Sequence, residues 1–254
     1  MGYYVPEKIM SNFDFEKILD TSDEWIRTMT GVEERRFAAP EEATSDLCIK
    51  AAEKALKVAG MTIDDIDMII VATVTPDYPV QSTACLVQHK MGARNVPSFD
   101  VNAACSGFIY SLTIAGSMIR SGIYKNVLVI GAEVLSRILD MTNRSNCILF
   151  GDGAAAAVVS EVEDGYGMLS TYLGAKGEDD YILKIPAGGS KKPNDAETIA
   201  NRENFLVMKG SEVFKFAVHA LPSATNKALK IANVKSEELK MIFPHQANVR
   251  IIES

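Results

Sequence analysis

The sequence predicts a layered α/β protein in which helices cover a central, largely buried sheet. Short runs of continuous apolar residues alternate with segments whose apolar residues recur at helical spacing. The 254 residues are 47% hydrophobic and 23% charged, enough to build a substantial core. A helix–loop–strand stretch also recurs later in the chain, so we expect two related halves.

The alternation predicts individual helices and strands along the first two thirds of the chain. Helices are expected at residues 45–59, 82–91 and 108–121, and the first and last of them end at Gly60 and Gly122. Strands are expected at residues 67–74, 98–101, 126–132, 154–160 and 168–175. The polar residues 176–204 are interpreted as an irregular surface excursion.

The repeat relates two short segments of the chain. Residues 54–70 read KALKVAGMTIDDIDMII, and residues 227–243 read KALKIANVKSEELKMIF. Seven of these 17 positions are identical, at a constant offset of 173. We therefore expect a strand at 241–243 and two halves, one at 1–165 and one beginning at 166 and running to 254. The position equivalent to Cys105 would fall beyond Ser254, so we expect the C-terminal half to be incomplete here.

Cysteine usage and charge exclude several classes of protein. Four widely separated cysteines, without a CxxC pair or a histidine cluster, suggest neither a metal site nor a disulfide framework. No apolar run approaches the ~20 residues of a membrane span and no signal peptide is visible, so we expect a cytoplasmic protein that does not bind membranes. The net charge of −7 argues against a nucleic-acid partner. Residues 205–250, however, carry seven basic residues against three acidic ones, which suits either an acidic partner or a solvated helix face.

Cys105 stands where a strand turns abruptly into small residues and then into a helix. The thiolate is the nucleophilic form of cysteine, and a helix N-terminus favours negative charge. The pattern therefore predicts a lowered thiol pKa and a catalytic cysteine. The alternative is a buried cysteine that acts only as a small hydrophobe.

His245 follows the strand expected at 241–243, where that strand gives way to a helix. Ligands and catalytic groups in α/β sheets gather at the carboxyl ends of strands, so Cys105 and His245 are expected at a shared cleft. A structural role for His245 stays open at this point. His89 and His219 lie within predicted helices and are interpreted as surface or packing residues.

Five segments together resemble the beta-ketoacyl-acyl-carrier-protein synthase III family of the thiolase-like superfamily. They are TSDEWI at 21–26, DVNAACSGF at 100–108, FGDG at 150–153, GSEVFK at 210–215 and PHQANVR at 244–250. They span nearly the whole chain in the family's order. The resemblance implies an acyltransferase with a duplicated, layered α-β-α-β-α thiolase-like fold.

The resemblance also implies a mechanism without a cofactor. Cys105 would take a short acyl group, with acetyl-CoA as the expected donor, and malonyl-acyl carrier protein would then lose carbon dioxide. The resulting carbanion would attack the acyl-Cys105 thioester and give a 3-oxoacyl-carrier-protein, which initiates a fatty-acid chain. His245 would stabilise the enolate together with an asparagine that the family carries beyond the position of Ser254. We therefore expect weak or absent condensation by this chain.

Binding roles transfer residue by residue from the same resemblance. Trp25 and Arg144 match positions that stack on the CoA adenine, and Thr21 lies beside them. The pantetheine channel matches Gly210, Phe214, Ala247 and Asn248. The carrier-protein docking segment matches Gln246, Ala247, Asn248, Val249 and Arg250. A homodimer is also implied.

Three positions depart from the family's pattern, and three alternatives to the fatty-acid reaction stay open. Met29 and Ser145 replace an arginine and a glycine near the CoA site, and Val80 replaces a large aromatic near the acyl pocket. The first alternative is a related condensing enzyme of secondary metabolism or a hydroxymethylglutaryl-CoA synthase. The second is a degradative thiolase, and the third is a truncated, non-catalytic subunit that binds carrier protein.

Overall fold

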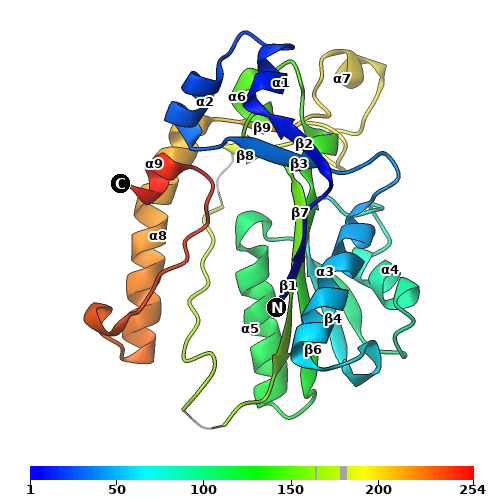
Figure 1. Ribbon diagram of the computed structural model, residues 1–254, viewed down its shortest axis with the longest axis vertical. Coiled ribbons are helices and arrows are strands. Elements are labelled where there is room, and N and C mark those ends of the chain that lie inside the picture. The colour runs from blue at the N-terminus through cyan, green and yellow to red at the C-terminus, as the bar shows by residue number, and fades with distance from the viewer. Residues whose placement is uncertain (164, 178–181) are drawn as a thin grey trace. The chain divides into compact units, whose positions relative to one another are not determined.

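The computed structural model describes residues 1–163, 165–177 and 182–254, which form two compact units (Figure 1). The first unit comprises Met1–Ile9, Arg36–Leu135 and Gly151–Leu169. The second comprises Met10–Arg35, Ser136–Phe150 and Ser170–Ser254. Contacts define these units, whereas the halves at 1–165 and 166–254 rest on sequence similarity and stay a prediction.

The first unit contains a sheet, three longer helices and two 3-10 turns. Its strands are β1 (Gly2–Tyr4), β4 (Met68–Ala72), β5 (Ser98–Val101), β6 (Asn126–Val134) and β7 (Asp152–Ser160). Its helices are α3 (Thr44–Ala59), α4 (Thr83–Lys90) and α5 (Gly107–Arg120), and its 3-10 turns are η1 (Ile63–Asp65) and η2 (Ala104–Ser106).

The five strands of this unit are ordered β1-β7-β6-β4-β5. β4 pairs in parallel with both β5 and β6, whereas β7 runs antiparallel to β6 and β1. Ala72, the last residue of β4, lies opposite Val101 of β5 and Gly131 of β6. The carboxyl ends of three parallel strands therefore meet at one edge of the sheet.

Two helices cover the two faces of this sheet, α3 on one side and α5 on the other (Figure 1). Ile69 and Leu128 belong to the cluster packed under α3, while Ile70 and Val129 pack with Ala115 of α5. Neighbouring positions thus point to opposite faces, and both faces are apolar, as expected for buried parallel strands. Burying each such side chain contributes about 1.5–3 kcal/mol.

The predicted ends of the helices are confirmed. Helix α3 ends at Ala59 because Gly60 adopts a left-handed conformation, with φ of 66°. Helix α5 ends at Arg120, and Gly122 is left-handed in the same way, with φ of 73°. The strands predicted at 67–74, 98–101, 126–132 and 154–160 correspond to β4, β5, β6 and β7.

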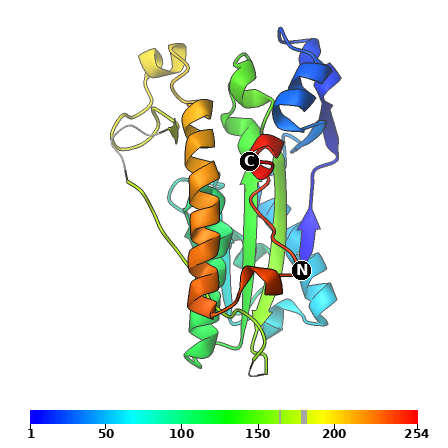
Figure 2. The ribbon, with the colours of Figure 1, turned by 90° about the vertical axis from the view of Figure 1, so that its left-hand side faces the viewer.

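The second unit is mainly helical. Its helices are α1 (Asn12–Glu16), α2 (Asp23–Thr30), α6 (Arg144–Cys147), α7 (Ala196–Ala200), α8 (Gly210–Ala232) and α9 (Val249–Ile252), and it includes the 3-10 turn η4 (Ser236–Glu238). Strands β8 (Leu183–Lys184) and β9 (Val207–Met208) pair with each other. Figure 2 shows the chain leaving the end of α8 and running back along it to α9. Outside these sets, β2 (Lys8–Ser11) pairs with β3 (Glu34–Phe37), and a 3-10 turn, η3, covers Leu135–Ile138.

Two predicted strands are wrong. Residues 168–177 and 239–247 contain no strand pairing, so neither 168–175 nor 241–243 is a strand. A strand requires a neighbouring backbone with which to pair. Residues 168–170 contact other groups instead: a Cβ on Gly116 would meet Met168 Cε at 2.3 Å, and Ser170 Oγ donates to Ala228 O at 2.8 Å. Residues 241–243 are exposed. An apolar sequence alone therefore does not predict a strand, because it does not show whether another backbone segment lies beside it.

Within the part of the chain that the structure describes, no helix is both long enough and apolar enough to cross a bilayer.

Candidate active site

Cys105 lies on a sharp turn at the carboxyl edge of the sheet in the first unit. β5 ends at Val101, the 3-10 turn at Ala104–Ser106 follows, and α5 begins at Gly107. Ala104 has a φ of 44°, which a residue with a side chain rarely adopts. Strained backbone of this kind gathers at functional sites, and here it directly precedes the thiol.

Small residues let this turn lie directly on the ends of β4 and β6. A Cβ on Gly107 would approach Ala72 Cβ to 3.0 Å, and a Cβ on Gly131 would approach Phe108 Cδ2 to 3.3 Å. A side chain at position 107 would therefore crowd Ala72 where α5 approaches β4. Cys105 is held between the ends of parallel strands and the start of α5, as the sequence predicted.

The expected direction of the Cys105 pKa is wrong. Cys105 is accessible to solvent, yet the protein around its sulfur raises the pKa of the thiol above its ordinary value. Desolvation is the main cause, and the negative charge of Glu133 adds to it. A backbone N–H of the turn opposes both but does not outweigh them. The free thiol is therefore mostly protonated near neutral pH.

Glu133 is the residue near the nucleophile that the sequence interpretation missed. It lies near the end of β6, where Thr75 Oγ1 donates to its Oε2 at 2.6 Å and Val74 N donates to its Oε1 at 2.9 Å. Burial raises the pKa of this carboxyl, and the hydrogen bonds that it accepts oppose the rise. The available signal was a lone acid at the end of the apolar run NVLVIGAEV.

His245 belongs to the second unit, in the segment between η4 and α9. Its side chain is exposed, but the surrounding protein lowers the pKa of the imidazole by desolvation, which favours the neutral ring. Cys105 and His245 belong to different units, so their pairing stays a prediction. His89 and His219 are exposed on α4 and α8, consistent with surface positions.

Trp25 and Arg144 lie together in the second unit. The guanidinium of Arg144 stacks on the Trp25 ring, with Cζ 5.1 Å from the ring centroid, and its Nη1 donates to Asp20 O at 2.5 Å. The adjacent Thr21 hydroxyl is buried and has no hydrogen-bond partner among the described residues. A planar ligand ring that enters between Trp25 and Arg144 must displace the guanidinium, and Thr21 offers such a ligand an unused polar group.

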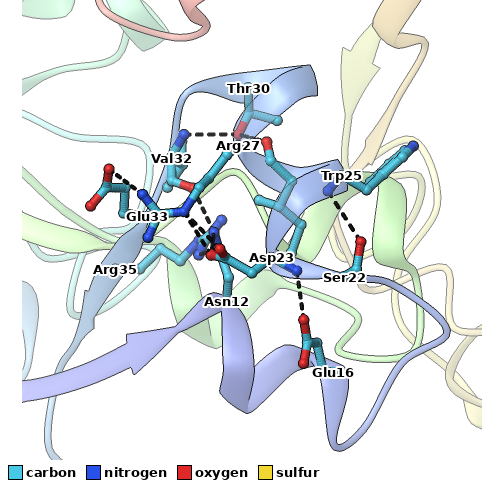
Figure 3. Close-up of polar contacts among 11 residues, drawn as sticks. Asn12, Glu16, Ser22, Asp23, Trp25, Arg27, Thr30, Val32, Glu33 and Arg35 are labelled. Carbon is cyan, nitrogen blue, oxygen red and sulfur yellow. Dashed lines mark hydrogen bonds and ion pairs between the residues drawn. The ribbon is translucent and has the colours of Figure 1, made fainter.

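A buried polar network fixes the two helices that carry Trp25 and Arg144. Asn12 Nδ2 donates to Asp23 Oδ1, in the first turn of α2, at 2.8 Å (Figure 3). Arg35 Nη1 donates to Asn12 Oδ1 at 2.5 Å, and Arg35 Nε donates to Ile148 O, just after α6, at 2.6 Å. Burial lowers the pKa of Arg35 to about 10, so the guanidinium stays charged at neutral pH. The network thus joins the start of α2 to the end of α6.

The N-terminus of α2 is fixed by its own cap. Ser22 Oγ accepts the backbone N–H of Trp25 at 3.1 Å, and Glu16 Oε1 accepts that of Asp23 at 2.6 Å (Figure 3). Serine is a preferred N-cap residue because its oxygen satisfies one of the free amides of the first turn. The TSDEW segment is thereby a helix start that carries Trp25, and this residue is 37% exposed.

Helix α9 docks onto the C-terminal end of α2. Asn248 Nδ2 donates to Met29 O at 3.1 Å, and Asn248 Oδ1 caps α9 by accepting the backbone N–H of Arg250 at 2.9 Å. The Arg250 guanidinium lies over the Phe214 ring of α8, 5.9 Å from its centroid. Trp25 and Met29 are four residues apart on α2 and share one helix face. Helix α9 therefore contacts α2 one helix turn away from Trp25.

The remaining predicted binding residues lie on α8, on α9 and in the segment that leads to α9. Gly210 opens α8, Val249 opens α9, and Gln246 and Ala247 are exposed in the segment that leads to α9. In the described part of the chain, no group of histidine, cysteine, aspartate and glutamate side chains is arranged to hold a metal ion.

Comparisons with known proteins agree on one family. The profile of 3-oxoacyl-[acyl-carrier-protein (ACP)] synthase III matches residues 99–177, and that of stage V sporulation protein AD matches residues 19–136. A beta-ketoacyl-[acyl-carrier-protein] synthase III of Fusobacterium nucleatum is 63% identical over 254 residues, which are 100% of this chain and 77% of that protein. Its counterpart in Caldanaerobacter subterraneus is 54% identical, over 100% of this chain and 76% of that protein.

Solved structures give the same result. The 3-oxoacyl-[acyl-carrier-protein] synthase III of Aquifex aeolicus superposes with a TM-score of 0.89 at 47% identity, and the synthase III of Thermus thermophilus with 0.90 at 44%. Each match covers 99% of this chain and 77% of the other. The predicted thiolase-like α/β fold is confirmed.

Proposed function

The chain belongs to the beta-ketoacyl-[acyl-carrier-protein] synthase III family, and from this premise we propose that it condenses a short acyl-CoA with malonyl-acyl carrier protein. The product is a 3-oxoacyl-carrier-protein, the first intermediate of a fatty-acid chain, so the protein is an acyltransferase. The observation that carries the assignment of chemistry is Cys105, an accessible thiol on a strained turn between a strand end and a helix start. No cofactor takes part.

In the first half-reaction the acyl group moves to the enzyme. The Cys105 sulfur attacks the thioester carbon of the acyl-CoA, a new carbon–sulfur bond forms, and CoA leaves as its thiol after taking up a proton. Thiols suit this step because they are good nucleophiles and good leaving groups. Because desolvation and Glu133 hold the free thiol protonated, the proton must leave when the acyl donor binds.

In the second half-reaction malonyl-acyl carrier protein loses carbon dioxide, and its carbanion attacks the acyl-Cys105 carbonyl. The thiolate of Cys105 leaves and the 3-oxoacyl product departs on the carrier protein. We assign His245 to the enolate oxygen that develops during decarboxylation. The lowered pKa of His245 supports this role, because the neutral imidazole can donate a hydrogen bond from one N–H to the enolate oxygen without transferring the proton.

The CoA site is proposed at Trp25, Arg144 and Thr21. Their contacts support the proposal, because an aromatic ring, a guanidinium and an unpaired hydroxyl suit an adenine base and its phosphates. We place the pantetheine along Gly210, Phe214, Ala247 and Asn248. Met29 offers no cation at its position, so phosphate binding falls to Arg144 and to the other basic side chains of this unit.

Carrier-protein docking is proposed for Gln246, Ala247, Asn248, Val249 and Arg250. The basic balance of residues 205–250 supports an acidic partner, and Arg250 is exposed and held over Phe214. The enzyme is proposed to act as a homodimer in the cytoplasm, where its four free cysteines stay reduced.

The test of the proposed function follows both half-reactions. The protein is incubated with radiolabelled acetyl-CoA, freed of excess label, and then mixed with malonyl-acyl carrier protein. We expect protein-bound label that passes only slowly to an acetoacetyl-carrier-protein. No protein-bound label, or equal label on a Cys105→Ala variant, would contradict the function.

The docking assignment has a separate test in Arg250→Glu. We expect weaker binding of carrier protein, by about 1 kcal/mol or more because an attractive charge becomes repulsive, with little change in acetyl loading. The matched control is Lys57→Glu, which makes the same charge change at an exposed position of α3, outside residues 205–250. Equal losses of loading and binding in Arg250→Glu would defeat the assignment.

A further inference from the structure

Glu133 is an acid at the carboxyl end of an otherwise apolar sheet face. Alternate residues of a strand share a face, so Glu133 lies on the same side of β6 as Val127, Val129 and Gly131. Val127 and Val129 pack in the α5 cluster, and Gly131 faces the Phe108 ring at the start of α5. Glu133 therefore points toward the end of α5 where the Cys105 turn lies.

The hydrogen bonds around Glu133 show that its carboxyl acts only as an acceptor. Thr75 Oγ1 accepts the backbone N–H of Val134 at 2.9 Å, so its hydroxyl proton is free for the 2.6 Å bond to Glu133 Oε2. Thr73 Oγ1 accepts the N–H of Thr75 at 3.1 Å and is 3.4 Å from the same carboxylate oxygen. Val74 N donates to the other oxygen. This set of donors suits the ionised form.

The charge of Glu133 has no counter-ion within the described residues, since none of the ion pairs there includes it. Two other acids near this sheet edge instead accept hydrogen bonds from the first turns of helices. Asp77 accepts the N–H and Oγ–H of Ser45, and Asp100 accepts the N–H groups of Thr83 and Ala84. A partly buried, unpaired carboxylate costs desolvation energy, so its place beside a nucleophile calls for a functional explanation.

Taking the proposed role of Cys105 as its premise, we propose that Glu133 is a positioning residue for the nucleophile. Its carboxylate gathers the Thr73–Thr75 loop at the end of β4, the strand on which the Cys105 turn lies, and its charge keeps the resting thiol protonated. The start of α5 favours a thiolate. Glu133 opposes that effect, which protects the empty enzyme from alkylation and oxidation until an acyl donor binds.

The test measures how Cys105 ionises. The rate of Cys105 alkylation by iodoacetamide is followed across pH by peptide mass spectrometry, because only the thiolate reacts. In Glu133→Gln the midpoint is expected at lower pH, with the thiolate fraction below the midpoint raised about threefold or more. Glu133→Asp keeps the charge and should return the midpoint toward the wild-type value. An unchanged midpoint in Glu133→Gln would overturn the proposal.

Three controls distinguish a direct effect of the Glu133 charge from a change in net charge, from a loss of stability and from an effect of His245. Glu53→Gln makes the same change of net charge on the exposed side of α3 and should leave the midpoint unchanged. The Glu133→Gln shift should persist in a His245→Ala background, and a shift that needs His245 would overturn direct action by Glu133. Lower thermal stability with no shift would mean that Glu133 is only structural. Alkylation requires no acyl donor, so this result is independent of whether acetyl-CoA loads Cys105.

Discussion

The two copies of the repeated sequence, at residues 54–70 and 227–243, build the same helix ending. Both helices end at a left-handed residue, Gly60 with φ of 66° and Asn233 with φ of 55°. The N–H of each donates to a carbonyl three residues back, at 3.2 and 3.3 Å. Local sequence alone accounts for this agreement, because glycine and asparagine are the residues that adopt this conformation most readily.

The agreement continues through the following 3-10 turn. Asp65 accepts the N–H of Thr62 at 2.8 Å, and in the second copy Glu238 accepts the N–H of Lys235 at 2.8 Å. Each acid stands three residues after the amide that it caps, the spacing of a capping box. The offset of 173 between the copies is thus kept in the hydrogen bonds as well as in the sequence.

The two copies differ in the segment that follows the 3-10 turn, which is a strand only in the first copy. Residues Met68–Ala72 form β4, which pairs on both edges and is fully buried. The equivalent Met241, Ile242 and Phe243 are unpaired and 66%, 56% and 82% exposed. Helix caps and turns are therefore set within a few residues, whereas a strand depends on neighbours from distant parts of the chain.

The sharpest test of this contrast truncates the same residue type at equivalent positions. Ile69→Ala removes a fully buried side chain from the core and should lower the free energy of unfolding by about 2–5 kcal/mol. Ile242→Ala alters an exposed side chain and should stay within about 0.5 kcal/mol. Urea denaturation measures both, and similar losses would show that the second strand segment is packed after all.

The helix endings allow a smaller test. Gly60→Ala should cost about 1–2 kcal/mol, because alanine disfavours the left-handed conformation. A Cβ there meets no atom within 4 Å, so the cost is conformational and not a clash. Asn233→Gly should lose nothing. A loss in Asn233→Gly as large as that in Gly60→Ala would mean that the Asn233 side chain does more than permit the turn. Thermal unfolding of the two variants measures both losses of stability.

The smallest expected effect concerns Asp65, the acid in the 3-10 turn η1 of the first copy. The backbone N–H of Thr62 holds the pKa of Asp65 below its ordinary 3.8, so the folded state binds this proton less readily than the unfolded chain. The contribution to stability is present above pH 3.8 and is lost as pH falls through the folded-state value. Asp65→Asn should lower the melting temperature slightly at neutral pH, with the difference vanishing in acid. Asp64→Asn makes the same charge change, and an equal effect there would contradict the capping role.

The candidate site follows the same division between local and distant determinants. The turn at Cys105 and the Ser22 cap before Trp25 each depend on a few consecutive residues, and the sequence predicts the turn. The stacking of Arg144 on Trp25 and the approach of Glu133 to Cys105 depend on residues far apart in the chain, and no local pattern contains them. The predicted thiol pKa had the wrong direction because the helix start was visible in the sequence, while burial and the neighbouring carboxylate were not.

The proposed function depends on transfer of the acyl group to Cys105. The most direct measurement is peptide mass spectrometry of the protein after brief incubation with acetyl-CoA alone, with Cys105→Ala treated in parallel. We predict one acetyl group on the peptide that contains Cys105 and none in the variant. Acetylation at Cys85, or equal acetylation of the variant, would contradict it.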